Sequence, residues 1–144
     1  MCKCALASAL ILRAVMGMSD VSDQLKKRTM RFALDACALI RELPQFEPGP
    51  TAKRQLAKAA TGVAFNYRAT CRARSHTEFT ARMGVVAEEA DESQGWLEFI
   101  EAAELIKSAA LTRLSREATE LAAITSAAYG TARYNQKRKG KRQS

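Results

Sequence analysis

The chain has 144 residues, a formal net charge of +8 at pH 7, and only 3 prolines and 7 glycines. This length suits one domain with a substantial core and is too short for two independent domains. Alanine, leucine, glutamate, lysine and arginine dominate the composition, which favours an all-helical fold, and no segment has the pattern of a strand. The chain has 4 cysteines and no evident secretory context, so we expect reduced thiols and a cytoplasmic protein.

The first 17 residues differ from the rest of the chain. A short apolar run, Ala5–Leu12, resembles a signal peptide, but Arg13 interrupts it and no small-residue cleavage site is well placed after it. The run is also far shorter than the roughly 20 residues that a membrane span needs. We expect residues 1–17 to be a leader that is disordered or that reflects an upstream start site. A targeting element and an extra packing segment are the alternatives.

Residues 18–134 carry four helical patterns of apolar side chains. The first pattern runs from about Val21 to Leu43 and stops before Pro44, after which "PQFEPGP" predicts a loop. The second pattern opens near Thr51 and continues to about Tyr67. Its many small residues indicate a close approach between helices.

The third pattern begins at "SHTE", where Ser75 and Glu78 have the spacing of a capping box. An apolar stripe then continues to Ile100. The fourth pattern starts after Ser108 and reaches about Tyr134. Four helices of about 20–27 residues with short connections predict an antiparallel up-down four-helix bundle. Residues 135–144 should form a basic, disordered tail.

The charge is unevenly distributed. The tail holds 5 of the 23 basic residues and the leader 2, which leaves the remaining body nearly neutral, with 16 basic and 15 acidic residues. Within this body, Thr51–Arg82 is strongly basic and Met83–Glu104 is acidic without a basic residue. Blocks of opposite sign can pair between helices or between subunits, or the basic block can recruit a polyanion.

The residues that could support catalysis are few. His76 has no acidic residue at metal-ligand spacing and is expected to face solvent, while Cys37 and Cys71 are expected to be small buried hydrophobes. Glu88 and Glu92 share a helix face but lack a nearby histidine, so ion pairing or solvation is favoured over metal binding. We expect no enzymatic activity, no metal, no cofactor and no small-molecule substrate.

The basic block is the feature that suggests a ligand. Arg68 and Arg72 lie four residues apart on one helix face, where a phosphate backbone could follow them. The acidic block is their rival partner, within one chain or between subunits. Because aromatic residues are few and Tyr67 should point inward, base stacking is not expected. The candidate nucleic-acid-binding residues are Arg68, Arg72, Arg74, Arg82, Lys137, Arg138, Lys139, Lys141 and Arg142.

The segment "GVAFNYRATCRARSHTEFTARMGVVAEEADESQGWLEFI", Gly62–Ile100, resembles the signature region of a bacterial family. These are the four-helix-bundle proteins encoded by intervening sequences in large-subunit ribosomal RNA genes. The segment "EATELAAITSAAYGTAR" also fits the pattern, and the resemblance covers about Asp20 to Asn135. The matching residues of the first segment are Gly62, Asn66, Tyr67, Arg68, Arg74, Ser75, Phe79, Met83, Glu89, Ala90, Glu92, Trp96, Leu97 and Glu98.

The resemblance implies an up-down four-helix bundle that assembles into a homo-oligomeric ring, typically a homopentamer. The family includes the accessory variability determinant of diversity-generating retroelements, a basic protein that binds nucleic acid and a reverse transcriptase. This chain differs from that accessory protein because its body is nearly neutral and its excess charge lies in the tail.

Two functional hypotheses follow. The first is a non-enzymatic, oligomeric accessory protein that binds RNA or DNA, with a reverse transcriptase as a further candidate partner. The second is a self-assembling protein–protein scaffold that has no direct role with nucleic acid.

Overall fold

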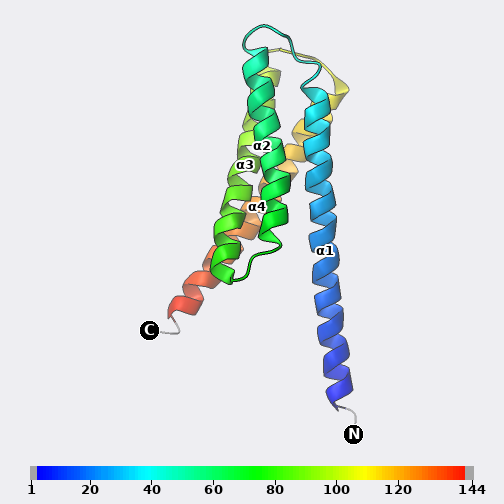
Figure 1. The fold of residues 1–144 in the computed structure, drawn as a ribbon, viewed down its shortest axis with the longest axis vertical. Coiled ribbons are helices and arrows are strands. Elements are labelled where there is room, and N and C mark those ends of the chain that lie inside the picture. Colours follow the sequence, from blue (N-terminus) through cyan, green and yellow to red (C-terminus); the bar gives the residue numbers. More distant parts are fainter. Residues whose placement is uncertain (1–2, 142–144) are drawn as a thin grey trace.

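The structure is a computed structural model that describes the backbone of residues 3–141 and the side chains of residues 20–138. Four helices make up the fold, in the order α1 (Lys3–Leu39), α2 (Gly49–Thr70), α3 (His76–Ala102) and α4 (Ala109–Lys141). Figure 1 shows them running alternately up and down, with short connections. The predicted all-α, up-down four-helix bundle is confirmed.

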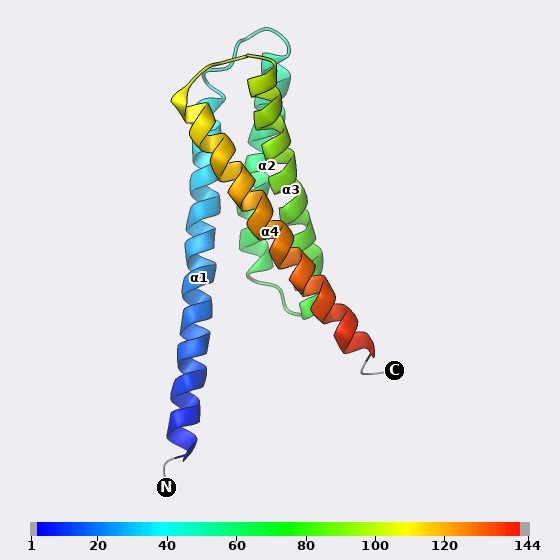
Figure 2. The same ribbon diagram turned by 180° about the vertical axis from the view of Figure 1, so that it is seen from behind.

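Each helix packs on its neighbours in the sequence. α1 contacts α2, α2 contacts α3, and α3 contacts α4, while a smaller contact between α1 and α4 closes the bundle. α4 crosses the bundle obliquely, so α1 and α4 meet near the end that holds the α1–α2 loop and diverge toward the chain termini (Figure 2). One link across this pair is Arg28, whose Nε donates a hydrogen bond to Glu117 Oε1 at 2.6 Å.

The core follows the apolar stripes expected from the sequence. Phe32, Leu56, Leu97 and Leu121, one from each helix, are almost completely buried. Burial of such side chains is the main favourable contribution to folding. Small residues let the helices approach closely. A Cβ on Gly84 would lie 3.0 Å from the Tyr129 ring, so a larger residue at this position of α3 would require the ring to shift.

The first and last helices extend further than expected. α1 begins at Lys3, so residues 3–17 form a continuous helix whose beginning projects beyond the other three helices (Figure 1). α4 continues through residues 135–141, where a disordered tail was expected. Lysine, arginine, glutamine, leucine and alanine are all good helix formers, and basic side chains are favourable at a helix C-terminus. Local helix propensity therefore accounts for the helical backbone of residues 135–141.

The end of the first helix also differs from the prediction. α1 ends at Leu39, and residues 40–43 form a turn, although the predicted helix continued to Leu43. Leu43 nevertheless remains buried in the core. Its place in the apolar pattern therefore reflects packing of the turn rather than continuation of the helix.

Candidate nucleic-acid interface

The corner between α2 and α3 is built by local hydrogen bonds. Ser75 has an extended backbone and caps α3, its Oγ accepting from the Glu78 backbone N–H at 3.0 Å. The Glu78 carboxylate accepts the Arg74 backbone N–H at 2.9 Å. The capping interaction predicted at Ser75 is confirmed, while the reciprocal bond goes to Arg74 instead of Ser75. These bonds fix the turn that separates the two helices.

Four arginines gather around this corner. Arg68 lies on the last turn of α2, Arg72 and Arg74 come from the connection that follows it, and Arg82 comes from the second turn of α3. All four are exposed. They line one groove of about 530 Å³, together with Phe65, Ala69 and Glu78. The four arginines proposed from the sequence are therefore neighbours in space, and we call their surface the arginine groove.

The arginines of this groove differ in their partners. Arg82 is bound to Glu78, with its Nε 2.9 Å from Glu78 Oε1. The Arg74 backbone N–H and the Arg82 guanidinium lower the pKa of the Glu78 carboxyl, which therefore stays ionised. Among residues 20–138, no carboxylate forms an ion pair with Arg68, Arg72 or Arg74. Three of the four guanidinium groups are therefore available to an anionic ligand.

The acidic block of α3 forms no ion pair with these arginines among the described residues. Glu88, Asp91 and Glu92 are exposed, and the described ion pairs do not include them. Glu89 instead packs toward α2, where Lys58 is the cation that favours its charged form. Among the described residues, direct ion pairs between the two charge blocks are therefore not observed, and pairing between subunits stays a prediction.

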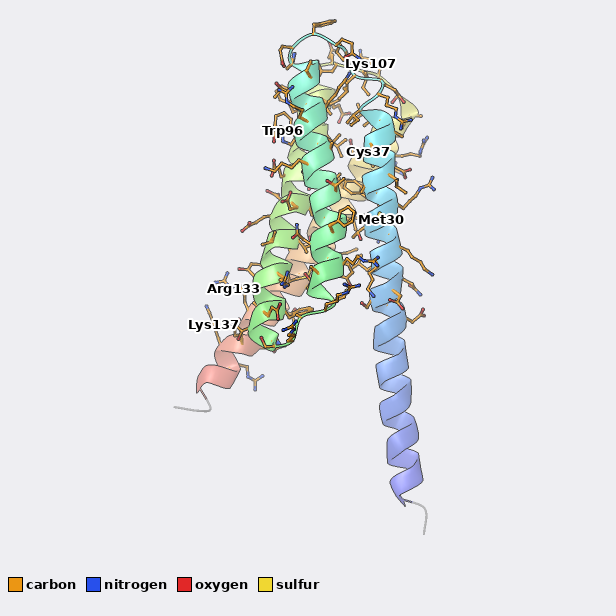
Figure 3. The ribbon with its side chains drawn as sticks, in the orientation of Figure 1. Met30, Cys37, Trp96, Lys107, Arg133 and Lys137 are labelled. Carbon is orange, nitrogen blue, oxygen red and sulfur yellow. The ribbon has the colours of Figure 1, made fainter. Side chains whose placement is uncertain are left out.

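The C-terminal part of α4 lies beside the beginning of α3. His76 Nε2 is 2.9 Å from the Ala132 carbonyl oxygen, and Gln136 Nε2 donates to Thr77 Oγ1 at 3.4 Å. Lys137 projects from this end of the bundle, whereas Lys107 marks the opposite end (Figure 3). The basic end of α4 and the arginine groove therefore lie at the same end of the molecule.

The remaining basic residues of α4 are described in part. Arg138 is exposed, with its guanidinium 5.8 Å from the centroid of the Tyr134 ring. Lys139 and Lys141 belong to α4, but their side chains lie outside the described part, as does the whole of Arg142. The helix carries this basic segment as a continuation of α4 rather than as a loose tail.

Two residues of this end were missed by the reasoning from sequence. Phe65 is 60% exposed and lies one turn before Arg68 and Ala69 on the same face of α2. Arg133 lies 5.5 Å from the centroid of the Tyr129 ring, on the part of α4 that faces α3. The spacing of Phe65, Arg68 and Arg72 by three and four residues could have indicated that an aromatic ring belongs to the basic face.

His76 and Cys71 differ from what the sequence suggested. His76 is half-buried rather than solvent-facing because α4 crosses the start of α3 and offers it the Ala132 carbonyl. Cys37 is half-buried, and Cys71 is exposed at the end of α2, 3.2 Å from Ser22 Oγ. Tyr67, one turn before Cys71, is buried, as its place in the apolar pattern predicted. Burial raises the pKa of its hydroxyl to about 12.

Metal binding and membrane spanning are two further properties on which the described residues give information. Within residues 20–138, histidine, cysteine and acidic side chains do not come together in threes around a space that could hold a metal ion. No helix of the described chain is both long enough and apolar enough to cross a membrane.

The fold and this surface define an up-down four-helix bundle with a basic end. Residues 23–127, well over half of the chain, match the family described as 23S rRNA-intervening sequence protein. The chain belongs to this family, as the resemblance of its central segment indicated. No curated protein shows significant similarity to the chain.

A solved structure supports the fold independently. The chain is similar to a protein of unknown function from the S23 ribosomal protein family of Bacteroides thetaiotaomicron. The two share 21% sequence identity with a TM-score of 0.64, and the similarity covers 72% of this chain and 96% of the other. At this identity the similarity establishes a common fold.

Proposed function

We propose that the protein is a non-enzymatic accessory protein that binds RNA or DNA through its basic end. The observation that carries the proposal is the arginine groove, where Arg68, Arg72 and Arg74 are exposed and have no carboxylate partner among residues 20–138. Guanidinium groups bind phosphate oxygens with charge-assisted hydrogen bonds, which makes arginine the preferred side chain for this ligand.

The basic part of α4 supports the same proposal. Lys137 and Arg138 extend the positive surface at the end of the bundle that holds the groove. Each further phosphate that a cation neutralises releases counterions and adds to the affinity, so additional cations at this end would strengthen binding. The groove and the end of α4 would then contact successive phosphates of one strand.

A salt titration tests this proposal. We expect the full chain to bind a generic single-stranded RNA and a duplex DNA at low salt. Log affinity should fall against log salt by roughly 0.7 per phosphate contact for single strands and 0.9 for duplex DNA. Replacing Arg68, Arg72 and Arg74 together by glutamine should weaken binding and make the slope shallower. Fluorescence anisotropy measures both quantities.

Two controls locate the interaction. The variant R41Q/R54Q/R116Q removes the same charge from exposed arginines near the opposite end and should retain the slope of the wild type. Deletion of residues 135–144 separates α4 from the groove. If this deletion alone abolishes binding, α4 carries the interaction and the groove does not. Absence of binding at low salt by the intact chain would overturn the proposal.

A self-assembling scaffold is the second candidate function. The acidic residues Glu88, Asp91 and Glu92 are exposed beside the bundle, and none has an ion-pair partner in the described part of the chain. Large apolar side chains, including Leu34 and Val85, are also exposed. Subunit contacts would cover both kinds of side chain at once. In this case the arginines would bind the acidic block of a neighbouring copy.

A further inference from the structure

Phe65 is an exposed aromatic ring within a basic surface. Its side chain is 60% exposed, although phenylalanine contributes more to stability when it is buried. The ring does not belong to the core cluster of the bundle, and it lines the arginine groove. Among the exposed rings of the described chain, Phe65 is singled out by its place beside the cations of the groove.

Phe65 and Arg68 lie on one face of the last turns of α2, and Arg72, in the turn after the helix ends at Thr70, continues this stripe. With a rise of about 1.5 Å per residue, Arg68 lies about 4.5 Å further along the helix axis than Phe65. Arg74 enters the groove from the turn beyond them. The stripe therefore places a planar apolar surface at one end and cations along the path that leads away from it.

The groove has room for a nucleotide. Its volume of about 530 Å³ is within the range of sites for small ligands, roughly 300–1,000 Å³. Glu78, the acidic residue of the groove, has one oxygen bound to the Arg74 backbone N–H and the other to Arg82. Its negative charge is therefore already compensated by the protein, which lowers its repulsion of a phosphate.

We propose that the arginine groove selects single-stranded nucleic acid, with an unpaired base stacked on Phe65 and the adjoining phosphates bound by Arg68, Arg72 and Arg74. Stacking on an aromatic side chain needs the face of a base, which a duplex buries between its neighbours. The arginines alone would bind duplex and single strand alike. This inference rests on the proposed binding of nucleic acid and adds the form of the ligand.

The test compares unstructured 12-nucleotide strands of deoxythymidine and of uridine with a 12-base-pair DNA duplex. Replacing Phe65 by alanine should weaken binding of the single strands at least about fivefold, the lower end of what base stacking contributes. It should leave duplex binding unchanged. F65W should retain the affinity and F65L should lose it, because leucine keeps apolar bulk without a ring face. The two single strands also reveal whether the groove distinguishes RNA from DNA.

A matched control uses Phe46, which is 73% exposed in the α1–α2 loop at the opposite end of the bundle. F46A should bind every probe as the wild type does. A strand with abasic sites completes the cycle. It should bind the wild type more weakly than the normal strand, and F65A should weaken it no further.

The outcomes separate this inference from the function on which it rests. If the wild type binds no probe, the proposed function fails and the inference fails with it. If the wild type binds but F65A affects single strand and duplex equally, or affects neither, the stacking inference is overturned while binding by the arginines stands. A change in particle mass of F65A by light scattering would assign Phe65 to a subunit contact, and that result also overturns the inference.

Discussion

The carboxylate of Glu89 packs over Gly62 of the neighbouring helix. A Cβ on Gly62 would lie only 2.6 Å from Glu89 Cδ, so the absence of a side chain at residue 62 makes room for the carboxylate. Glu89 Oε2 is buried and has no hydrogen-bond partner among the described residues. Burial, followed by the nearby Glu92 charge, raises the pKa of Glu89. The folded protein therefore holds a proton at this site more readily than the unfolded chain does.

This environment predicts how stability depends on pH. The raised pKa means that stability from this site is lost as pH rises from the ordinary glutamate range through the folded-state pKa. Glu89→Gln removes that loss, so its free energy of unfolding should exceed that of the wild type at pH 7. The gain should shrink as pH falls through the ordinary glutamate range, where both states become protonated. Urea unfolding at pH 7 and pH 4 measures the difference.

Asp91→Asn provides the control because Asp91 is exposed on α3 and is not among the charges that shift the pKa of Glu89. It should show no pH-dependent gain. A Glu89→Gln variant that is less stable than the wild type at pH 7 would mean that the carboxylate has a favourable partner.

At the scale of the helices, α3 ends in a motif that usually contains glycine. Glu104 follows the last turn with φ 51°, in the left-handed region. The Leu105 N–H donates to the Ile100 carbonyl at 3.1 Å, and the Glu104 N–H donates to the Glu101 carbonyl at 3.0 Å. These two bonds define a Schellman motif, in which the left-handed position favours glycine because glycine has no Cβ.

Glu104→Gly should therefore raise the free energy of unfolding by about 0.5–1 kcal/mol, since relief of backbone strain exceeds the added entropy of the unfolded chain. The exposed ion pair between Glu104 and Lys107 is lost, but such pairs contribute little. Glu101→Gly, the same change inside the helix, should lower stability by about 1 kcal/mol. Thermal unfolding compares the two variants. Equal signs would contradict the assignment of strain to Glu104.

The helices themselves could be predicted from the sequence because their apolar residues repeat with the helical period. The cap at Ser75 and the close packing at Gly84 were also predictable, since each depends on a local motif or on the size of one residue. The spacing of Phe65 from Arg68 could have placed its ring on the basic face, but the groove that it lines depends on how α2 meets the turn and α3. The buried partner of His76 likewise depends on the crossing angle of α4, which no local pattern encodes.

At the scale of the whole molecule, self-assembly stays a prediction that the charges and exposed apolar side chains allow us to test. The acidic face of α3 and the arginine groove lie on the same chain without forming ion pairs with each other in the described part. Several large apolar side chains are exposed along the bundle. Apart from Phe65, to which another role is assigned above, they are Val21, Leu34, Phe46, Val85, Phe99, Ile124 and Tyr134.

We expect light scattering at micromolar concentration to give a particle several times the 15.8 kDa of the chain, with five copies as the number that the resemblance implies. Pairing of charge between subunits predicts that E88K/E92K reduces the mass, because like charges would then face each other. Circular dichroism checks that this variant remains helical. A wild-type monomer would contradict the expectation.

The light contact between α1 and α4 has a consequence for how the chain folds. The other three contacts join helices that follow each other in sequence, whereas this one brings together the two ends of the bundle. The α1–α4 contact closes a loop that includes α2 and α3, and closing this long segment costs more conformational entropy than pairing two adjacent helices. α1 is held to the rest of the bundle by its contact with α2 and by the smaller contact with α4, where Arg28 pairs with Glu117. The first helix is thus the part of the bundle that detaches at the smallest loss of packing.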